Sequence, residues 1–106
     1  MSPWIWIGLA GICEIAWAAG LKISDGFRRP YVSAVTVVIM ILSFVLLAQG
    51  MRKLPAGTSY AVWTGIGAAG TAVVGIVFLG ESASPARLAS LGLVIAGIVG
   101  LKLSSG

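Results

Sequence analysis

The residue of this sequence best suited to chemistry is Glu14, an acid in the middle of the otherwise uncharged apolar run at residues 4–21. An ionised side chain at the centre of a hydrocarbon layer costs about 2.5–3.5 kcal/mol on insertion scales. Burial favours the neutral acid, so we expect Glu14 to be protonated when empty and ionised when a cation lies beside it. Because a proton and a cation cannot both neutralise one carboxylate, Glu14 indicates proton-for-cation exchange. The alternative is a neutral acid that hydrogen-bonds a neighbouring helix and is only structural.

The neighbours of Glu14 on a helix fit a binding role. The residues at i−4, i−3, i+3 and i+4, which share its face, are Ala10, Gly11, Trp17 and Ala18. Small residues admit a partner or a substrate, and Trp17 adds an N–H donor and an aromatic face. Simple packing of Trp17 is the alternative.

Two further apolar runs supply polar and aromatic groups. Tyr60 and Trp63 share a helical face, and Gly67 continues the same stripe. Aromatic faces attract cations, and a tyrosine hydroxyl can orient a carboxylate. The pair alone is more typical of packing, but together with a lone acid it predicts a cation box. Ser43 lies midway along residues 31–51 and is either a hydrogen-bond partner for the site or a hydroxyl bonded to its own helix.

The composition excludes most other classes of function. The 106 residues include seven Lys or Arg and three Asp or Glu, with 58% hydrophobic residues and a mean hydropathy of +1.05. A soluble domain carries roughly 25% charged residues, against 9% here, and disordered chains are poor in apolar residues. The absence of His and the single Cys exclude the usual zinc and iron sites, His-based catalysis and an intrachain disulfide framework. With no phosphate-binding glycine loop either, we expect no metal, no cofactor, no nucleic-acid partner and no enzymatic activity.

The elements that must position these residues are four membrane-spanning helices. The expected spans are residues 4–21, 31–51, 58–79 and 85–103. The first three are long enough to cross a hydrocarbon core, which needs about 20 residues. The connections are short and rich in turn residues, which predicts antiparallel neighbours. The expected fold is therefore an all-α integral membrane protein with one four-helix transmembrane domain over residues 1–106.

The fourth span is the weakest of the set, since only residues 88–101 are uncharged, a length at which a buried or re-entrant segment is the alternative. Arg87 and Lys102 can extend their ammonium or guanidinium groups to the two interfaces and so lengthen the span. Ser84 followed by Pro85 is typical of a helix N-terminus. In the preceding loop, Glu81 is placed to pair with Arg87.

The charges give no preferred orientation in the membrane. One face carries Lys22, Arg28, Arg29 and Arg87, and the opposite face carries Arg52, Lys53, Lys102 and the terminal amine. Either the insertion machinery imposes one topology, or the chain inserts both ways and pairs as an antiparallel dimer. Four thin helices enclose little volume, so dimerisation is the simpler way to build a site at the membrane midplane. Small residues at Ser90 and Gly97 suit either a subunit contact or ordinary bundle packing.

Several of these segments are specific motifs. They are GICEIAW at residues 11–17, GLK at residues 20–22, LPAGTSYAVWTGIG at residues 54–67, and GE at residues 80–81. With them the sequence resembles the small multidrug resistance family over nearly its whole length. The resemblance implies an antiparallel, dual-topology homodimer of four-helix subunits, in which Glu14 of each chain binds protons and a cationic substrate in turn.

Within that family the sequence is most similar to the guanidinium-exporter subtype, because Trp17 and Ser43 stand at two of its marker positions. The resemblance implies that Trp17, Ser43 and Tyr60 form a hydrogen-bonded network around the glutamates and that Trp63 lines the site. A planar guanidinium suits a pair of carboxylates, which it can bind through paired N–H···O bonds. The positions matching the lipid-side opening of the site are Met40 and Phe44. Cys13 departs from the family pattern, where a bulkier residue is common.

These observations together predict a multi-pass antiporter of the bacterial inner membrane. It would exchange protons for guanidinium-like cations, including guanylurea, by alternating access. The alternatives are a broader exporter of quaternary ammonium compounds, one subunit of a heterodimeric pair or a non-transporting membrane subunit, and a passive cation channel.

Overall fold

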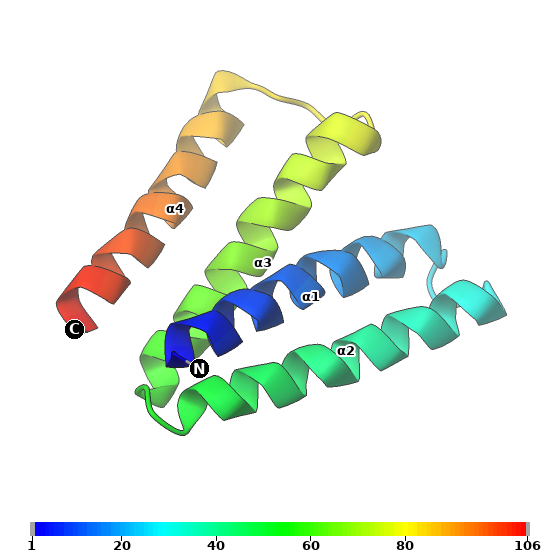
Figure 1. Ribbon diagram of the computed structural model, residues 1–106. Helices are drawn as coiled ribbons and strands as arrows, with labels where there is room; N and C mark the ends of the chain where they lie inside the picture. Colours follow the sequence, from blue (N-terminus) through cyan, green and yellow to red (C-terminus); the bar gives the residue numbers. More distant parts are fainter. Residues whose placement is uncertain (1, 106) are drawn as a thin grey trace.

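The computed structural model describes residues 2–105 and contains four helices: α1 (Pro3–Ile23), α2 (Pro30–Met51), α3 (Ala56–Phe78) and α4 (Pro85–Ser105) (Figure 1). All four are long and apolar enough to cross a membrane. The helices expected from the sequence are therefore all present. Their ends lie within two residues of the expected spans, and most differences lengthen a helix because helical hydrogen bonding continues beyond the strictly apolar run.

The helix ends follow from local sequence. Proline occupies the first turn of α1 and α2 and the first residue of α4, where its missing N–H costs nothing. The Ser84 hydroxyl accepts a hydrogen bond from the backbone N–H of Arg87 at 3.3 Å, which confirms the expected N-cap of α4. At the other end of that loop, Gly80 adopts a φ of +71°. This turn lets the N–H of Glu81 donate to the carbonyl of Gly75 at 3.0 Å and close α3.

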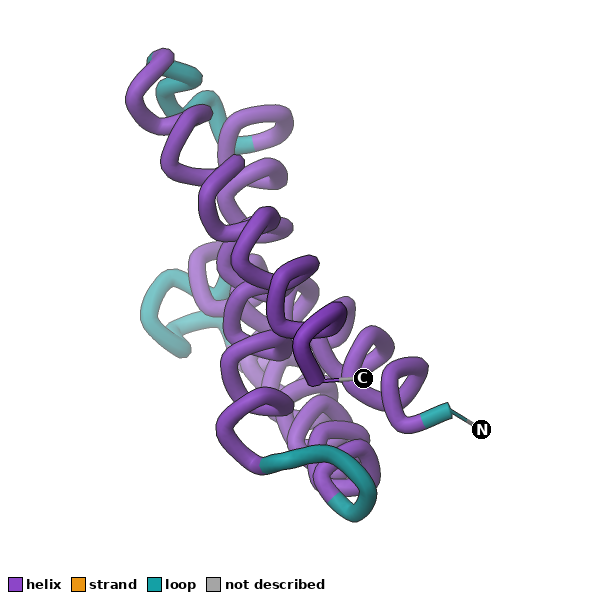
Figure 2. Tube along the Cα trace, turned by 90° about the vertical axis from the view of Figure 1, so that its left-hand side faces the viewer, coloured by secondary structure: helices purple, strands orange, loops and turns teal. Residues whose placement is uncertain are grey.

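Both termini and the α2–α3 loop lie at the lower left of Figure 1, and the chain runs away from them and back twice, with the α1–α2 loop at the right and the α3–α4 loop at the top (Figures 1 and 2). Helix α1 is central and packs against α2 and α3, whereas α4 has only α3 as a close backbone neighbour. None of the apolar spanning window of α4 is buried. Three helices thus form a bundle and the fourth lies along its side.

The core is small and lies where α1, α2 and α3 meet. Its buried hydrophobic residues are Ile7, Ala10, Leu47, Val62 and Trp63. Glycines allow this close approach, since a Cβ at Gly50 would overlap the Ile7 side chain. Many large apolar side chains face outward, which is the arrangement expected of helices in lipid, where small residues and polar contacts join the helices.

Candidate functional site

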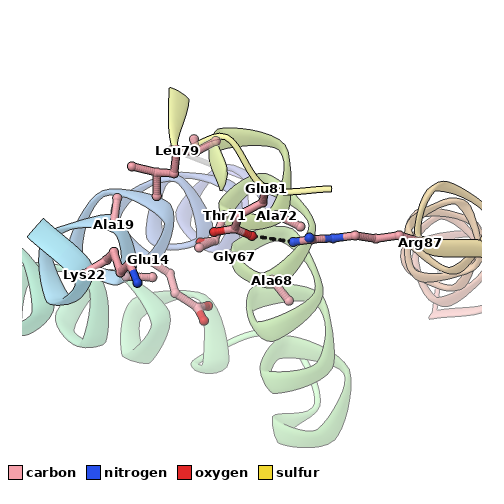
Figure 3. A pocket seen from close by; sticks show the side chains of 12 residues that line it. Glu14, Ala19, Lys22, Gly67, Ala68, Thr71, Ala72, Leu79, Glu81 and Arg87 are labelled. Carbon is pink, nitrogen blue, oxygen red and sulfur yellow. Dashed lines mark hydrogen bonds and ion pairs between the residues drawn. The ribbon is translucent and has the colours of Figure 1, made fainter. Parts of the chain in front are cut away.

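Glu14 faces a pocket of about 410 Å³ between α1 and α3 (Figure 3). On α1 the wall continues through Ala18 to Lys22, at intervals of one helical turn. On α3 it is made mainly of small residues that follow Gly67. The pocket therefore extends from the acid in the middle of α1 toward the end of that helix.

Gly67 is the residue of α3 against which the acid lies. A Cβ built at this position would overlap the Glu14 carboxyl group, and Gly67 itself is buried. The side chain of Glu14 is thus held against bare backbone. The sequence placed Tyr60, Trp63 and Gly67 on one face of a helix. Of these three residues, Gly67 is the one that lies against the Glu14 carboxyl.

Two polar side-chain atoms of α1 are buried without a hydrogen bond. Within residues 2–105, neither Oε1 of Glu14 nor Nε1 of Trp17 has a partner. Buried polar groups are normally paired, above all in a membrane. A purely structural Glu14 requires a hydrogen bond from its carboxyl to another helix, and Oε1 makes none to the described residues. Neither atom is satisfied by the described residues of the single chain.

Ser43 links three helices. Its hydroxyl donates to the backbone carbonyl of Ala10 at 2.7 Å and accepts from Nε1 of Trp63 at 3.0 Å. The side chain is fully buried. The interpretation of Ser43 as a hydroxyl bonded to its own helix is therefore wrong, and its hydrogen bonds join α2 to both α1 and α3.

Four aromatic residues form a row in which each ring contacts the next. Ring centroids lie 6.2 Å apart between Trp17 and Phe44, 5.7 Å between Phe44 and Trp63, and 5.5 Å between Trp63 and Tyr60. The first two contacts are edge-to-face, which is a favourable geometry for aromatic rings. Phe44 thus connects Trp17 to Trp63, although the sequence placed it only at an opening of the site.

The predicted site residues do not all meet in one place. Ser43 and Trp63 are hydrogen-bonded, and the aromatic row adds Trp17 and Tyr60, but none of these four residues lines the Glu14 pocket. Tyr60 ends the row with 57% of its surface exposed. Among the described residues, its hydroxyl makes no hydrogen bond to Glu14. Within residues 2–105 of a single protomer, the aromatic cluster is therefore not part of the wall of the Glu14 pocket.

An ion pair lies at the outer part of the pocket. Nη2 of Arg87 is 2.6 Å from Oε1 of Glu81, and the two side chains are 34% and 40% exposed, respectively. This confirms the pairing expected from the sequence. The Glu81 carboxyl lies over Gly75, where a Cβ would come within 2.6 Å of it. Nη1 of Arg87 also donates to the carbonyl of Ser82 at 3.2 Å. The pair and Lys22 line the same pocket as Glu14 (Figure 3).

Comparison with known proteins decides the family. A family model described as Small Multidrug Resistance protein matches residues 2–94. The chain belongs to the small multidrug resistance family. It is 62% identical over 102 residues to a protein named Guanidinium exporter from Yersinia pseudotuberculosis, covering 96% of this chain and 98% of that protein. Proteins of the same name from Citrobacter freundii and Salmonella typhimurium are 59% identical over 102 residues, covering 96% of this chain and 97% of theirs.

Membership of the small multidrug resistance family fits the fold. Four apolar helices and relatives named as exporters identify the chain as a multi-pass membrane protein. The resemblance inferred from the motifs of the sequence is thereby confirmed, including the similarity to guanidinium exporters.

One residue of the pocket escaped the sequence analysis. Thr71 lines the pocket with Glu14, and its Oγ1 is buried without a partner among residues 2–105. It stands one turn beyond Gly67, so continuing the Tyr60–Trp63–Gly67 stripe by four residues would have identified it.

Proposed function

We propose that this member of the small multidrug resistance family is a proton-coupled antiporter of the bacterial inner membrane that exports guanidinium and related small guanidinyl cations such as guanylurea. The observation that carries the proposal is the Glu14 carboxyl, with one buried and unpaired oxygen in a pocket between α1 and α3. The high identity to proteins named Guanidinium exporter supports the choice of substrate.

The chemistry of the site follows from charge balance. A carboxylate in a membrane is stable only with a cation or a proton beside it. A guanidinium ion is planar and permanently charged, and its N–H groups match carboxylate oxygens in pairs. When a proton binds Glu14 the attraction is lost and the guanidinium ion leaves. When the guanidinium ion binds, the proton leaves, so the two fluxes run in opposite directions.

The groups around the acid have distinct tasks in this proposal. Trp17 carries an N–H donor, so it serves the carboxylate rather than the cation. Ser43 holds the indole of Trp63 by a hydrogen bond of 3.0 Å, which fixes the aromatic row. The faces of that row stabilise positive charge near the site.

We further propose that the transporter is an antiparallel, dual-topology homodimer working by alternating access. Its support is that the spanning window of α4 is unburied and that basic residues divide almost equally between the two faces. A second copy in the opposite orientation covers α4 and brings a second Glu14 to the midplane. Two carboxylates then share one cation or two protons.

The proposal is tested by guanidinium flux in proteoliposomes that contain only this chain. A proton gradient should drive uptake, and Glu14→Gln should abolish both the flux and the coupled proton movement. Glu81→Gln is the matched control, since it neutralises an acid in the same pocket but outside the membrane centre. Activity that survives Glu14→Gln overturns the mechanism, and flux that ignores the proton gradient indicates a channel. Flux that needs a second, homologous chain indicates a heterodimer.

A broader exporter of quaternary ammonium compounds is the second candidate, and the aromatic row favours it. Aromatic faces attract any cation, including one without N–H groups. Comparing guanidinium, guanylurea and tetraalkylammonium ions in the same proteoliposomes separates the two. Preference for the guanidinyl cations supports the first proposal, and equal or better transport of tetraalkylammonium supports the second.

A further inference from the structure

Thr71 occupies a position from which it can contact whatever Glu14 binds. It lies on α3 one helical turn after Gly67, the residue against which the Glu14 carboxyl rests. Both Thr71 and Glu14 line the same pocket, as Figure 3 shows. The hydroxyl oxygen of Thr71 is buried and has no hydrogen-bond partner in the part of the chain that the structure describes.

An unpaired hydroxyl is unusual for a threonine inside a helix. Such hydroxyls normally bond to a carbonyl of the preceding turn, as those of Thr36, Ser90 and Ser104 do here. Thr36 donates to Val32 at 2.7 Å, and Ser90 donates to Ala86 at 2.8 Å. Ser33 and Ser59 also have unpaired hydroxyls, but neither lines the Glu14 pocket. Among the described residues, Thr71 is the only one that both lines the Glu14 pocket and has a buried, unpaired hydroxyl.

The pocket offers few acceptors for a cation that carries N–H groups. Among its lining residues, side-chain acceptors are limited to Glu14, Thr71 and Glu81, and the Glu81 carboxylate is already paired with Arg87. Alanine and glycine make up most of the remaining α3 wall. A guanidinium ion has three edges of N–H groups, and the Glu14 carboxylate serves one of them. Any N–H left unpaired in such a site weakens binding.

We propose that the Thr71 hydroxyl oxygen accepts a hydrogen bond from the guanidinyl cation held by Glu14, which makes Thr71 a specificity-determining residue of the export site. This inference rests on the proposed function and adds a residue to it. Glu14 supplies the charge complement, which every cation satisfies. Thr71 supplies a hydrogen-bond acceptor, which stabilises only cations that carry N–H groups. It therefore discriminates guanidinyl cations from quaternary ammonium ions.

The test compares substrate binding by Thr71→Val, which keeps the shape and removes the hydroxyl, with Thr71→Ser, which retains the hydroxyl. Guanidinium and tetramethylammonium dissociation constants are measured by tryptophan fluorescence on the purified, detergent-solubilised protein. Thr36→Val is the matched control, because it removes a buried threonine hydroxyl outside the pocket. Proton binding by Glu14 is followed on the same samples as a pH titration of the fluorescence.

We expect Thr71→Val to weaken guanidinium binding about tenfold or more, the usual effect of losing a hydrogen bond to a charged group. Its tetramethylammonium affinity and its proton titration should match the wild type, and Thr71→Ser and Thr36→Val should bind guanidinium within about threefold of it. The inference is overturned if Thr71→Val binds guanidinium like the wild type, or if it loses both cations equally. If the wild type itself fails to bind guanidinium, the proposed function fails first, and the two failures are thereby distinguished.

Discussion

Two polar clusters include residues of α1, and they differ in how their hydrogen bonds are satisfied. On the α2 side, the Ser43 hydroxyl joins the carbonyl of Ala10 to the indole of Trp63, and both bonds are 3.0 Å or shorter. On the pocket side, Glu14 and Thr71 each bury an oxygen with no partner among residues 2–105. The first cluster holds three helices in place. The second is left without hydrogen-bond partners by the described residues of the single chain, which is consistent with the proposed ligand site.

Under the proposed function, this contrast separates residues that position the site from residues that would touch the cargo. Removing a satisfied group leaves its former partners unpaired and affects stability. Removing an unsatisfied group costs the empty protein little but removes a contact to the ligand. Variants in the first cluster should therefore lose stability, and variants in the second cluster should lose ligand binding.

The largest effect is expected at Glu14. Because the proposed mechanism makes protons and the cation compete for this carboxyl, guanidinium binding to the wild type should weaken as the pH falls, and Glu14→Gln should bind no guanidinium at any pH. Fluorescence titrations at several pH values measure both. The reverse trend, tighter binding at lower pH, contradicts the competition.

A large effect is also expected when a side chain is added at Gly67, where the Glu14 carboxyl lies against the backbone. A methyl group at Gly67 overlaps the Glu14 carboxyl, so Gly67→Ala should displace it and reduce guanidinium flux about 10- to 100-fold. Gly57→Ala on the same helix is the control, because a Cβ there meets nothing within 4 Å. Equal flux in the two variants would show that the position of the carboxyl is not critical.

Ser43→Ala tests the satisfied cluster. It leaves the buried indole N–H of Trp63 without an acceptor, which should lower the free energy of unfolding by about 1–3 kcal/mol. Ser90→Ala removes a hydroxyl bonded only to its own helix and should change stability by less than about 0.5 kcal/mol. Unfolding by denaturant in mixed micelles measures both variants. A Ser43→Ala protein as stable as the control means that the cluster does not hold the helices.

The smallest effect is expected at the mouth of the pocket. Glu81 and Arg87 form an exposed pair, and such pairs contribute about 0–1 kcal/mol and are screened by salt. Glu81→Gln should change the unfolding free energy by less than about 1 kcal/mol, and raising the salt concentration should remove the difference. A larger loss that persists in high salt would assign the pair a structural role.

The sequence was sufficient for features that depend on local chemistry. Apolar runs predicted the four helices, Ser84 before Pro85 predicted the start of α4, and the spacing of Glu81 and Arg87 predicted their pairing. Features that depend on how helices cross were out of reach. Ser43 is separated by 33 and 20 residues from its two partners, and periodicity along one helix gives no register against another.

The same limitation explains why Glu14 and the aromatic residues were expected together. Helical spacing places Glu14 and Trp17 on one face of α1, but two residues on the same face can still contact different neighbouring helices. In the structure Trp17 contacts Phe44 of α2 while Glu14 lies against Gly67 of α3. Whether the two meet again depends on a second copy of the chain, which the proposed homodimer supplies.

The Glu81–Arg87 pair has a consequence for transport, because the side chain of Arg87 ends in the same group as the proposed cargo. It is tethered to its carboxylate by a short loop, and a tethered ligand acts at an effective concentration in the millimolar range. Free guanidinium well below that concentration cannot displace Arg87 from Glu81. Under the proposed mechanism, the mouth of the pocket therefore keeps its charge pattern while the cargo exchanges at Glu14, and cargo approaching millimolar levels begins to break the ion pair.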